Sequence, residues 1–187
     1  MKLYIKYMVS VRCKALVKEE LKKLGVKSQY VVVDLGVVDI LETITPKQRN
    51  LLKANLRKTG LEVLDNKKSV LIEKVKNTIT SMIHQSGELP SLNYSDYISE
   101  KLGYDYTYLA NIFSEVKGIT IQQYIIVQKI EKVKALLLYD ELSLTEISNK
   151  LQYSSVAHLS NQFKKVTGLN PSFFKQLKNK RQVQENV

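Results

Sequence analysis

The second half of the chain repeats itself, and this repeat limits the possible folds more than any other feature of the sequence. Residues 98–118 read ISEKLGYDYTYLANIFSEVKG, and residues 147–168 read ISNKLQYSSVAHLSNQFKKVTG. Identical residues recur at an offset of 49 in the first part of the repeat and at an offset of 50 in the second, so one residue has been inserted between these parts. The repeat therefore predicts two copies of one small unit.

Each copy has the pattern of a helix-turn-helix, with a short amphipathic helix, a tight connection and a second helix. The second helix has a polar N-cap candidate in both copies, Asp105 in the first and Ser154 or Ser155 in the second. The repeated apolar residues fall on facing stripes and are expected to form the core. They are Ile98, Leu102, Leu109 and Phe113 in the first copy and Ile147, Leu151, Leu159 and Phe163 in the second.

A long helix is predicted between the two copies. It opens with a capping-box pattern at residues 120–123 and keeps Ile126, Ile130, Val133 and Leu137 on one face. A second capping box, Ser143 to Glu146, opens the second copy. Such a helix would act as a rigid spacer that holds two recognition helices in successive major-groove segments, about 34 Å apart.

The side of each second helix that faces away from the core is expected to contact DNA. Asn pairs bidentately with adenine, Ser and Thr bond several base edges, and small apolar groups suit the thymine methyl. The predicted base contacts are Tyr106, Thr107, Ala110 and Asn111 in the first copy and Ala157, His158, Ser160 and Asn161 in the second. The predicted phosphate contacts are Lys117, Lys164, Lys165 and Lys175.

With these features, residues 91–178 resemble the DNA-binding domain of the AraC/XylS family of transcription regulators. The signature of that family's second unit is followed through Leu136, Leu137, Ile147, Phe163, Lys164, Lys165, Gly168, Pro171 and Phe174. The resemblance implies an activator or repressor of transcription with two helix-turn-helix units on a long helix. It places base-reading positions at Thr107, Ala110, Asn111, Ala157, Ser160 and Asn161.

The second copy departs from the family pattern at its turn. Gln152 stands where the family usually has Gly, and Ser148 stands where the preceding helix usually has Ala. Neither recognition helix has the Arg that is common there, and both have Asn, at positions 111 and 161. This composition favours adenine contacts or DNA shape over guanine readout.

The first half predicts an α+β domain of the ferredoxin-like type, in the order βαββαβ. The expected strands are residues 2–8, 29–35, 37–42 and 61–65, and the expected helices are residues 14–25 and 46–59. Thr45, Pro46 and Gln48 form a capping box with Pro at the first helical position.

A further helix over about 67–85 and the break at 87–91 lead into the repeat. The predicted organisation is a ferredoxin-like domain at 1–65, a connector helix and linker at 66–90, an all-α double helix-turn-helix domain at 91–178, and a basic, polar tail at 179–187.

The loop before the first helix, Met8 to Cys13, resembles the heavy-metal-associated domain, whose loop reads M-x-C-x-x-C. Two thiolates in that family bind a soft ion such as copper(I). Here Ser10 replaces the first cysteine, and a single thiolate does not form a two-sulfur site. We expect the fold without the metal chemistry. A weak or intermolecular metal site on Cys13, or a redox-sensitive thiol beside Arg12, is the alternative.

Net charge favours a polyanionic partner. The chain carries +11, with +8 in residues 1–90 and +3 in residues 91–187, and residues 154–187 alone carry +5. Duplex DNA is the predicted partner, and RNA polymerase and a second copy of the chain are left open as further partners. Nonspecific nucleic-acid binding and a metal- or thiol-responsive protein are the competing functions.

Missing motifs exclude other classes. The sequence has no phosphate-binding loop, nucleophile elbow or zinc-protease motif, so we predict no enzyme, no catalytic residue and no cofactor. No apolar run reaches the length of a membrane helix, and the single cysteine excludes internal disulfides. We expect a cytoplasmic, nucleoid-associated protein.

Overall fold

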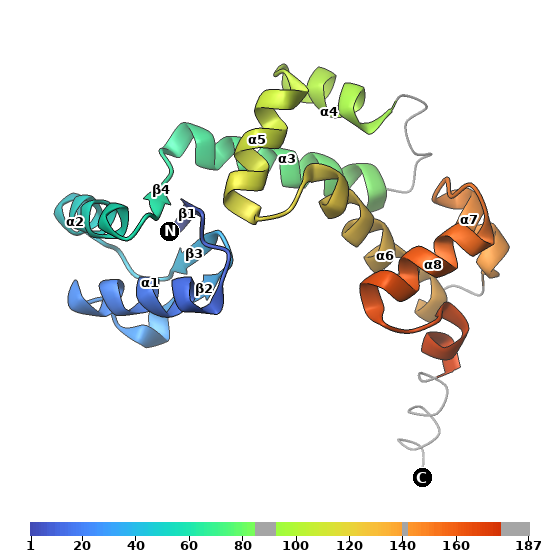
Figure 1. The fold of residues 1–187 in the computed structure, drawn as a ribbon, viewed down its shortest axis with the longest axis horizontal. Coiled ribbons are helices and arrows are strands. Elements are labelled where there is room, and N and C mark those ends of the chain that lie inside the picture. Colours follow the sequence, from blue (N-terminus) through green and yellow to red (C-terminus); the bar gives the residue numbers. More distant parts are fainter. Residues whose placement is uncertain (85–92, 140–141, 177–187) are drawn as a thin grey trace, which may run out of the picture. The chain divides into compact units, whose positions relative to one another are not determined.

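The computed structural model describes residues 1–84, 93–139 and 142–176 (Figure 1). The chain divides into two compact units, residues 1–76 with 102–121, and residues 77–101 with the chain from 122 onward. An α+β region followed by helices confirms the predicted fold class. The four domain ranges stay a prediction, and the tail at 179–187 lies outside the described residues.

A four-stranded antiparallel sheet forms the centre of the first unit. Its strands lie in the order β2-β3-β1-β4, and every pairing is antiparallel. The strands are β1 (Lys2–Lys6), β2 (Val31–Asp34), β3 (Val37–Ile40) and β4 (Glu62–Val63). With the intervening helices, this is the predicted split βαββαβ topology. Strand β1 ends earlier than predicted because Tyr7 adopts a left-handed conformation, with φ +63°.

Two helices, α1 (Val11–Lys23) and α2 (Pro46–Lys58), cover one face of this sheet. Helix α1 begins three residues before the predicted start because the Ser10 hydroxyl caps it and accepts from the Cys13 amide. The capping box of Thr45 and Gln48 is confirmed at the start of α2. Leu3 and Ile5 of β1 are buried in the core beneath the two helices.

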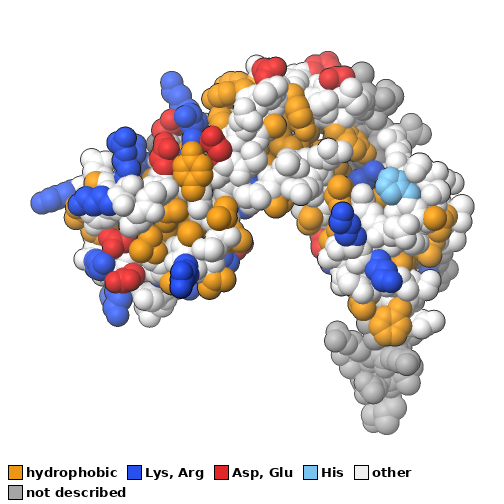
Figure 2. Space-filling view, in the orientation of Figure 1, with side chains coloured by type: hydrophobic (Ala, Val, Ile, Leu, Met, Phe, Trp, Pro, Cys, Tyr) orange, Lys and Arg blue, Asp and Glu red, His pale blue; other side chains and the backbone are white. Residues whose placement is uncertain are grey.

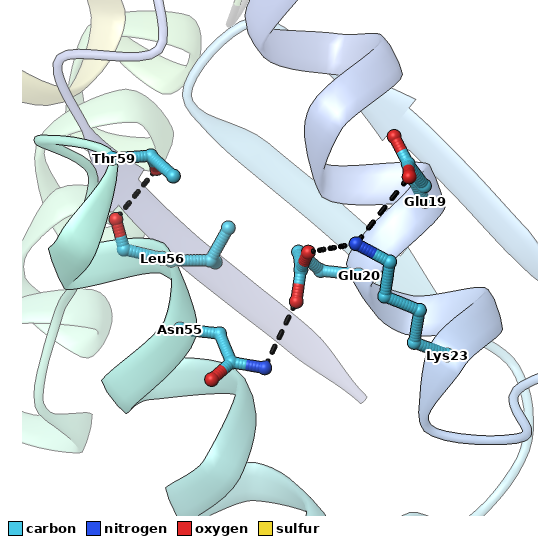
Figure 3. A network of polar contacts seen from close by, with 6 residues as sticks. All are labelled: Glu19, Glu20, Lys23, Asn55, Leu56 and Thr59. Carbon is cyan, nitrogen blue, oxygen red and sulfur yellow. Dashed lines mark hydrogen bonds and ion pairs between the residues drawn. The ribbon is translucent and has the colours of Figure 1, made fainter.

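Polar contacts link α1 to α2 on one side of each helix (Figure 3). Asn55 Nδ2 donates to Glu20 Oε2 at 2.9 Å, and Lys23 Nζ donates to Glu20 Oε1 at 2.8 Å. These bonds lower the pKa of Glu20, with the Lys23 bond contributing most. Asn55 therefore marks the side of α2 that faces α1.

The other face of the sheet carries α5 (Tyr106–Lys117) and the first part of α3 (Asn66–His84). Because side chains alternate along a strand, Tyr4 and Lys6 lie on the face opposite Leu3 and Ile5. The Tyr7 amide donates to the Glu115 carbonyl at 2.9 Å, and Lys6 Nζ lies 2.6 Å from Glu115 Oε2. Helix α5, which the sequence places in the first helix-turn-helix, is thus attached to the N-terminal sheet.

A glycine allows this close approach. Gly36, in the turn between β2 and β3, has φ +72°, and a Cβ atom there would lie 1.8 Å from the carbonyl oxygen of Val116. Any larger residue would collide with the backbone of α5. Gly36 therefore serves both the tight turn and the packing of α5.

The second unit packs its helices around α6 (Ile121–Tyr139). Its other elements are α4 (Tyr94–Leu102), α7 (Leu144–Lys150), α8 (Val156–Thr167) and the end of α3. The stripe of α6 formed by Ile130, Val133 and Leu137 is buried in one core with residues of the second copy. These are Ile147 of α7, Leu151 directly after that helix, and Leu159 and Phe163 of α8. The predicted inward faces of the second copy and of the spacer helix are confirmed.

A lysine is buried in this unit. Lys129 of α6 is 7% exposed, and its Nζ lies 4.5 Å from the ring centre of Tyr153 and 5.5 Å from that of Tyr94. The faces of aromatic rings attract a cation, and this attraction offsets part of the loss of hydration. Burial nevertheless lowers the pKa of Lys129 to about 8 and raises that of Tyr153.

The turn of the second copy has an unfavourable backbone conformation. Gln152 has φ +51°, whereas the equivalent residue of the first copy is Gly103, with φ +70°. A non-glycine residue in the left-handed region loses about 1–2 kcal/mol through contact of its Cβ with the backbone. Gln152 in place of glycine therefore lowers the stability of the turn, while the turn keeps the left-handed conformation seen at Gly103.

We predict that Gln152→Gly raises the free energy of unfolding by about 1 kcal/mol, because glycine removes the left-handed strain. Chemical denaturation monitored by circular dichroism measures the change. The reciprocal substitution Gly103→Gln should lower the stability by a similar amount, since no heavy atom lies within 4 Å of the added Cβ and only the backbone conformation is penalised. A decrease in stability for Gln152→Gly would contradict this account.

We also predict that stability rises with pH above about 8. The pKa of Lys129 falls from 10.5 in the unfolded chain to about 8 in the folded chain, so the unfolded state binds more protons between these values. The free-energy cost of burying the charged Lys129 is complete below pH 8 and disappears as pH rises. Near pH 10, tyrosine ionisation in the unfolded chain opposes the gain in stability. Thermal unfolding between pH 7 and 9.5 should show the rise in the parent chain and in Lys150→Met, an exposed control. Lys129→Met should show a clearly smaller rise, because the lowered pKa values of Lys117 and Cys13 still contribute in this range.

Candidate nucleic-acid interface

The two recognition helices, α5 and α8, are built alike although they belong to different units. Each has 12 residues. Asp105 caps α5 by accepting from the Tyr108 amide, and Ser155 caps α8 by accepting from the His158 amide, both at 3.0 Å. Each helix ends at a left-handed glycine, Gly118 or Gly168. Of the two cap candidates in the second copy, Ser155 is the one that caps the helix.

The predicted base contacts of α5 lie on one face of that helix. Thr107 and Asn111 are exposed, and Tyr106 and Ala110 are half-buried. Residues three and four apart are neighbours on a helix surface, so Thr107, Ala110 and Asn111 form one continuous patch. The burial of Tyr106 raises the pKa of its hydroxyl. This patch presents a hydroxyl, a methyl and a carboxamide to solvent.

The predicted base contacts of α8 form the matching patch. Ala157, His158 and Asn161 are exposed, and Ser160 is half-buried. The His158 ring is oriented by two residues of the turn, since its Nδ1 lies 2.9 Å from Ser154 Oγ and its ring meets that of Tyr153 edge-on at 5.3 Å. The turn thus fixes a potential hydrogen-bonding ring at the start of the helix.

The four predicted phosphate contacts fall into two groups. Lys164 and Lys165 at the end of α8 are exposed, and so is Lys175. Lys117 is half-buried on the N-terminal sheet, where its Nζ lies 3.5 Å from the Leu35 carbonyl and burial lowers its pKa. Its role at a phosphate stays a prediction, and the three exposed lysines are better placed for that role.

Sequence reasoning missed an exposed aromatic pair in the first copy. Tyr104 and Tyr108 stack with ring centres 5.9 Å apart and planes 21° apart, and they are 48% and 42% exposed. Tyr104 lies in the turn before the N-cap Asp105 and Tyr108 lies in the first turn of α5, so their contact depends on the path of the turn, which sequence spacing does not give. The pair adds two hydroxyl groups beside the α5 patch.

The N-terminal loop contains one thiol, that of Cys13. Within the described residues, no three His, Cys, Asp or Glu side chains gather closely enough to hold a metal ion. Cys13 Sγ lies 3.2 Å from Ser10 Oγ, and this hydrogen bond contributes most to lowering the pKa of Cys13.

Within the part of the chain that the structure describes, no helix has both the length and the apolar composition to cross a membrane.

Basic side chains cover a wider area than the two patches. Figure 2 shows Lys and Arg side chains projecting from the surface of the N-terminal domain as well as from the surface near the last helices. Cationic surface of this kind attracts polyanions irrespective of their sequence.

Comparison with known proteins finds one family model and several relatives that are similar to part of this chain. A family model described as "Helix-turn-helix domain" matches residues 98–176. The Msm operon regulatory protein of Streptococcus mutans is 34% identical over 100 residues, which cover 53% of this chain and 35% of that protein. The F1 operon positive regulatory protein of Yersinia pestis is 31% identical over 108 residues, which cover 58% of this chain and 36% of that protein. The match spans about a third of the length of each relative.

One solved structure supports the fold. A transcriptional regulator of Chromobacterium violaceum, described as one of the AraC-type DNA-binding domain-containing proteins, aligns with a TM-score of 0.53 and 17% sequence identity. The alignment covers 61% of this chain and 96% of that chain.

Proposed function

We propose that the chain is a sequence-specific DNA-binding transcriptional regulator of the AraC/XylS type. The premise is that residues 98–176 match the family model of a helix-turn-helix domain. The proposed mechanism is that α5 and α8 each enter one of two successive major-groove segments of duplex DNA. One chain would then recognise an asymmetric site of about two helical turns.

The observation that carries the proposal is the repetition of one recognition helix with its polar face exposed. Asn111 and Asn161 occupy equivalent positions of α5 and α8, and both are exposed. A carboxamide pairs with the N6 and N7 atoms of adenine in a way that no other base pair satisfies. The methyl groups of Ala110 and Ala157 suit a neighbouring thymine, which favours A·T steps in both half-sites.

Electrostatic attraction supports binding to the DNA backbone. Residues 154–187 carry a net charge of +5, and Lys164, Lys165 and Lys175 are exposed. Lysines release counterions from DNA when they meet phosphates, and this gain is independent of sequence. We assign these three lysines to affinity and the two asparagines to specificity.

Further partners follow from the proposed role. One relative is a positive regulator of an operon by its name, and for an activating role of this chain we propose RNA polymerase as a further partner. A homodimer would double the footprint on DNA. Both partners, together with a cytoplasmic, nucleoid-associated location, are extensions of the proposal. The geometry around Cys13 does not favour a metal-dependent, thiol-dependent or catalytic role.

We predict that Asn111→Ala and Asn161→Ala each relax base preference in a different half-site. The loss on the preferred sequence should be about 1–3 kcal/mol, because one bidentate contact disappears. Selection of binding sites from a random duplex library measures the preference, and Asn149→Ala, at an exposed position of α7, is the control. Equal losses on every sequence would assign these residues to structure or backbone binding.

Lys164→Ala combined with Lys165→Ala should weaken binding to all duplexes by a similar factor. The slope of log affinity against log salt should become less steep by about 0.9 for each phosphate contact that is lost. Fluorescence anisotropy at several salt concentrations measures this slope, with Lys18→Ala combined with Lys22→Ala, both at exposed positions of α1, as a control of equal side-chain change. A loss confined to the preferred sequence would show that these lysines contact bases.

A further inference from the structure

A groove in the first unit lies between α2 and the edge strand β4. It consists of two adjoining cavities of about 640 and 330 Å³, and Lys53 and Val63 line both. The larger cavity reaches Lys67 at the start of α3, and the smaller one reaches Tyr7. Cavities of several hundred Å³ are the size that small-molecule ligands occupy.

Basic residues line this groove along α2. The helix contains five basic residues and no acidic one. Arg49, Lys53 and Arg57 are spaced four residues apart, so they follow one side of the helix. Asn55 is two residues from Lys53 and contacts α1, and residues two apart point to different sides (Figure 3). The basic side is therefore the side that lines the groove.

Two acidic residues, Asp65 and Glu62, also line the groove. Asp65 Oδ1 accepts from the Lys68 amide at 2.8 Å and caps the start of α3. Glu62 pairs across the sheet with Lys6, whose pKa is raised first by its bond to Glu115 and also by the charge of Glu62. The basic side chains of Lys53, Arg57 and Lys67 line the groove together with Arg49, and they outnumber the carboxylates of Asp65 and Glu62.

An apolar wall completes the groove. Val63 and Leu64 are buried, and Ile44 is half-buried beside them. A cationic side facing an apolar wall suits a molecule with an anionic group and an apolar body. Removal of the apolar body from water favours binding, and the anionic group pairs with the basic side chains.

We propose that this groove binds a small organic anion, whose charge meets Lys53 and Lys67 and whose apolar body lies against Val63 and Leu64. The binding site does not depend on the DNA-binding function.

Occupancy of the groove has a route to α5. Tyr7 lines the smaller cavity and donates its amide hydrogen to the Glu115 carbonyl, and Lys6 beside it pairs with the Glu115 carboxylate. A ligand that contacts Tyr7 would change how firmly α5 is held on β1. An effect of the ligand on DNA affinity rests on the proposed function, whereas its binding does not.

The test uses 8-anilinonaphthalene-1-sulfonate, a fluorescent organic anion, titrated into the full chain without DNA. We expect saturable binding that Lys53→Gln combined with Lys67→Gln weakens about tenfold or more, because two charge-assisted contacts are lost. Lys18→Gln combined with Lys22→Gln, an equal charge change at exposed positions of α1, should alter the affinity less than about twofold. Lys53→Arg combined with Lys67→Arg should retain binding.

Competition separates the two parts of the proposal. Benzoate should displace the probe at about tenfold lower concentration than acetate, which has the same charge and almost no apolar body. Equal displacement, absence of saturable binding, or equal losses in the two Lys→Gln pairs would each overturn the proposal. A further outcome would overturn it: the variant with Lys53→Gln and Lys67→Gln keeps its affinity for the probe but loses affinity for DNA, with a shallower dependence of DNA affinity on salt. The groove would then bind the DNA backbone. Failure of the Asn111 and Asn161 predictions would leave the probe result unaffected.

Discussion

Burial of strand β1 on both faces is the constraint on which the first unit depends. Leu3 and Ile5 face the helices α1 and α2, while Tyr4 and Lys6 face α3 and α5. If only one face of this short sheet were covered, the other face would be exposed to water. These four residues of β1 contact the helices on both faces. The helix that carries Thr107 and Asn111 is consequently part of the same packing unit as the N-terminal sheet.

The second recognition helix is supported by other means. Helix α8 packs Leu159 and Phe163 against α6, and Phe174 meets Phe163 edge-on at 5.5 Å. Helices α5 and α8 therefore both have a polar N-cap, 12 residues and a terminal glycine, but they pack against different elements. Local sequence is sufficient to specify such a helix, because the cap and the terminal glycine act within a few residues.

Local patterns in the sequence predicted most of the elements, and contacts between distant residues account for the differences. The repeat predicted both helix-turn-helix units, and the spacing of Leu109 and Phe113 predicted which side of α5 is buried. Nothing within β1 indicated that Tyr7 would end the strand, since its conformation is tied to Glu115, more than a hundred residues away. The half-burial of Lys117 and the groove beside Lys53 likewise arise from tertiary packing, which periodicity does not encode.

The close contact of Gly36 with Val116 has a consequence for how the chain can be divided. Val116 is fully buried, and the backbone of the β2–β3 turn lies against its carbonyl. A fragment that starts at the predicted boundary near residue 91 would retain both recognition helices in sequence but expose this surface of α5 to water. The modular boundary drawn from sequence similarity is therefore not the boundary of the packed unit, and exchanging the N-terminal domain for another would require a new surface to cover Val116.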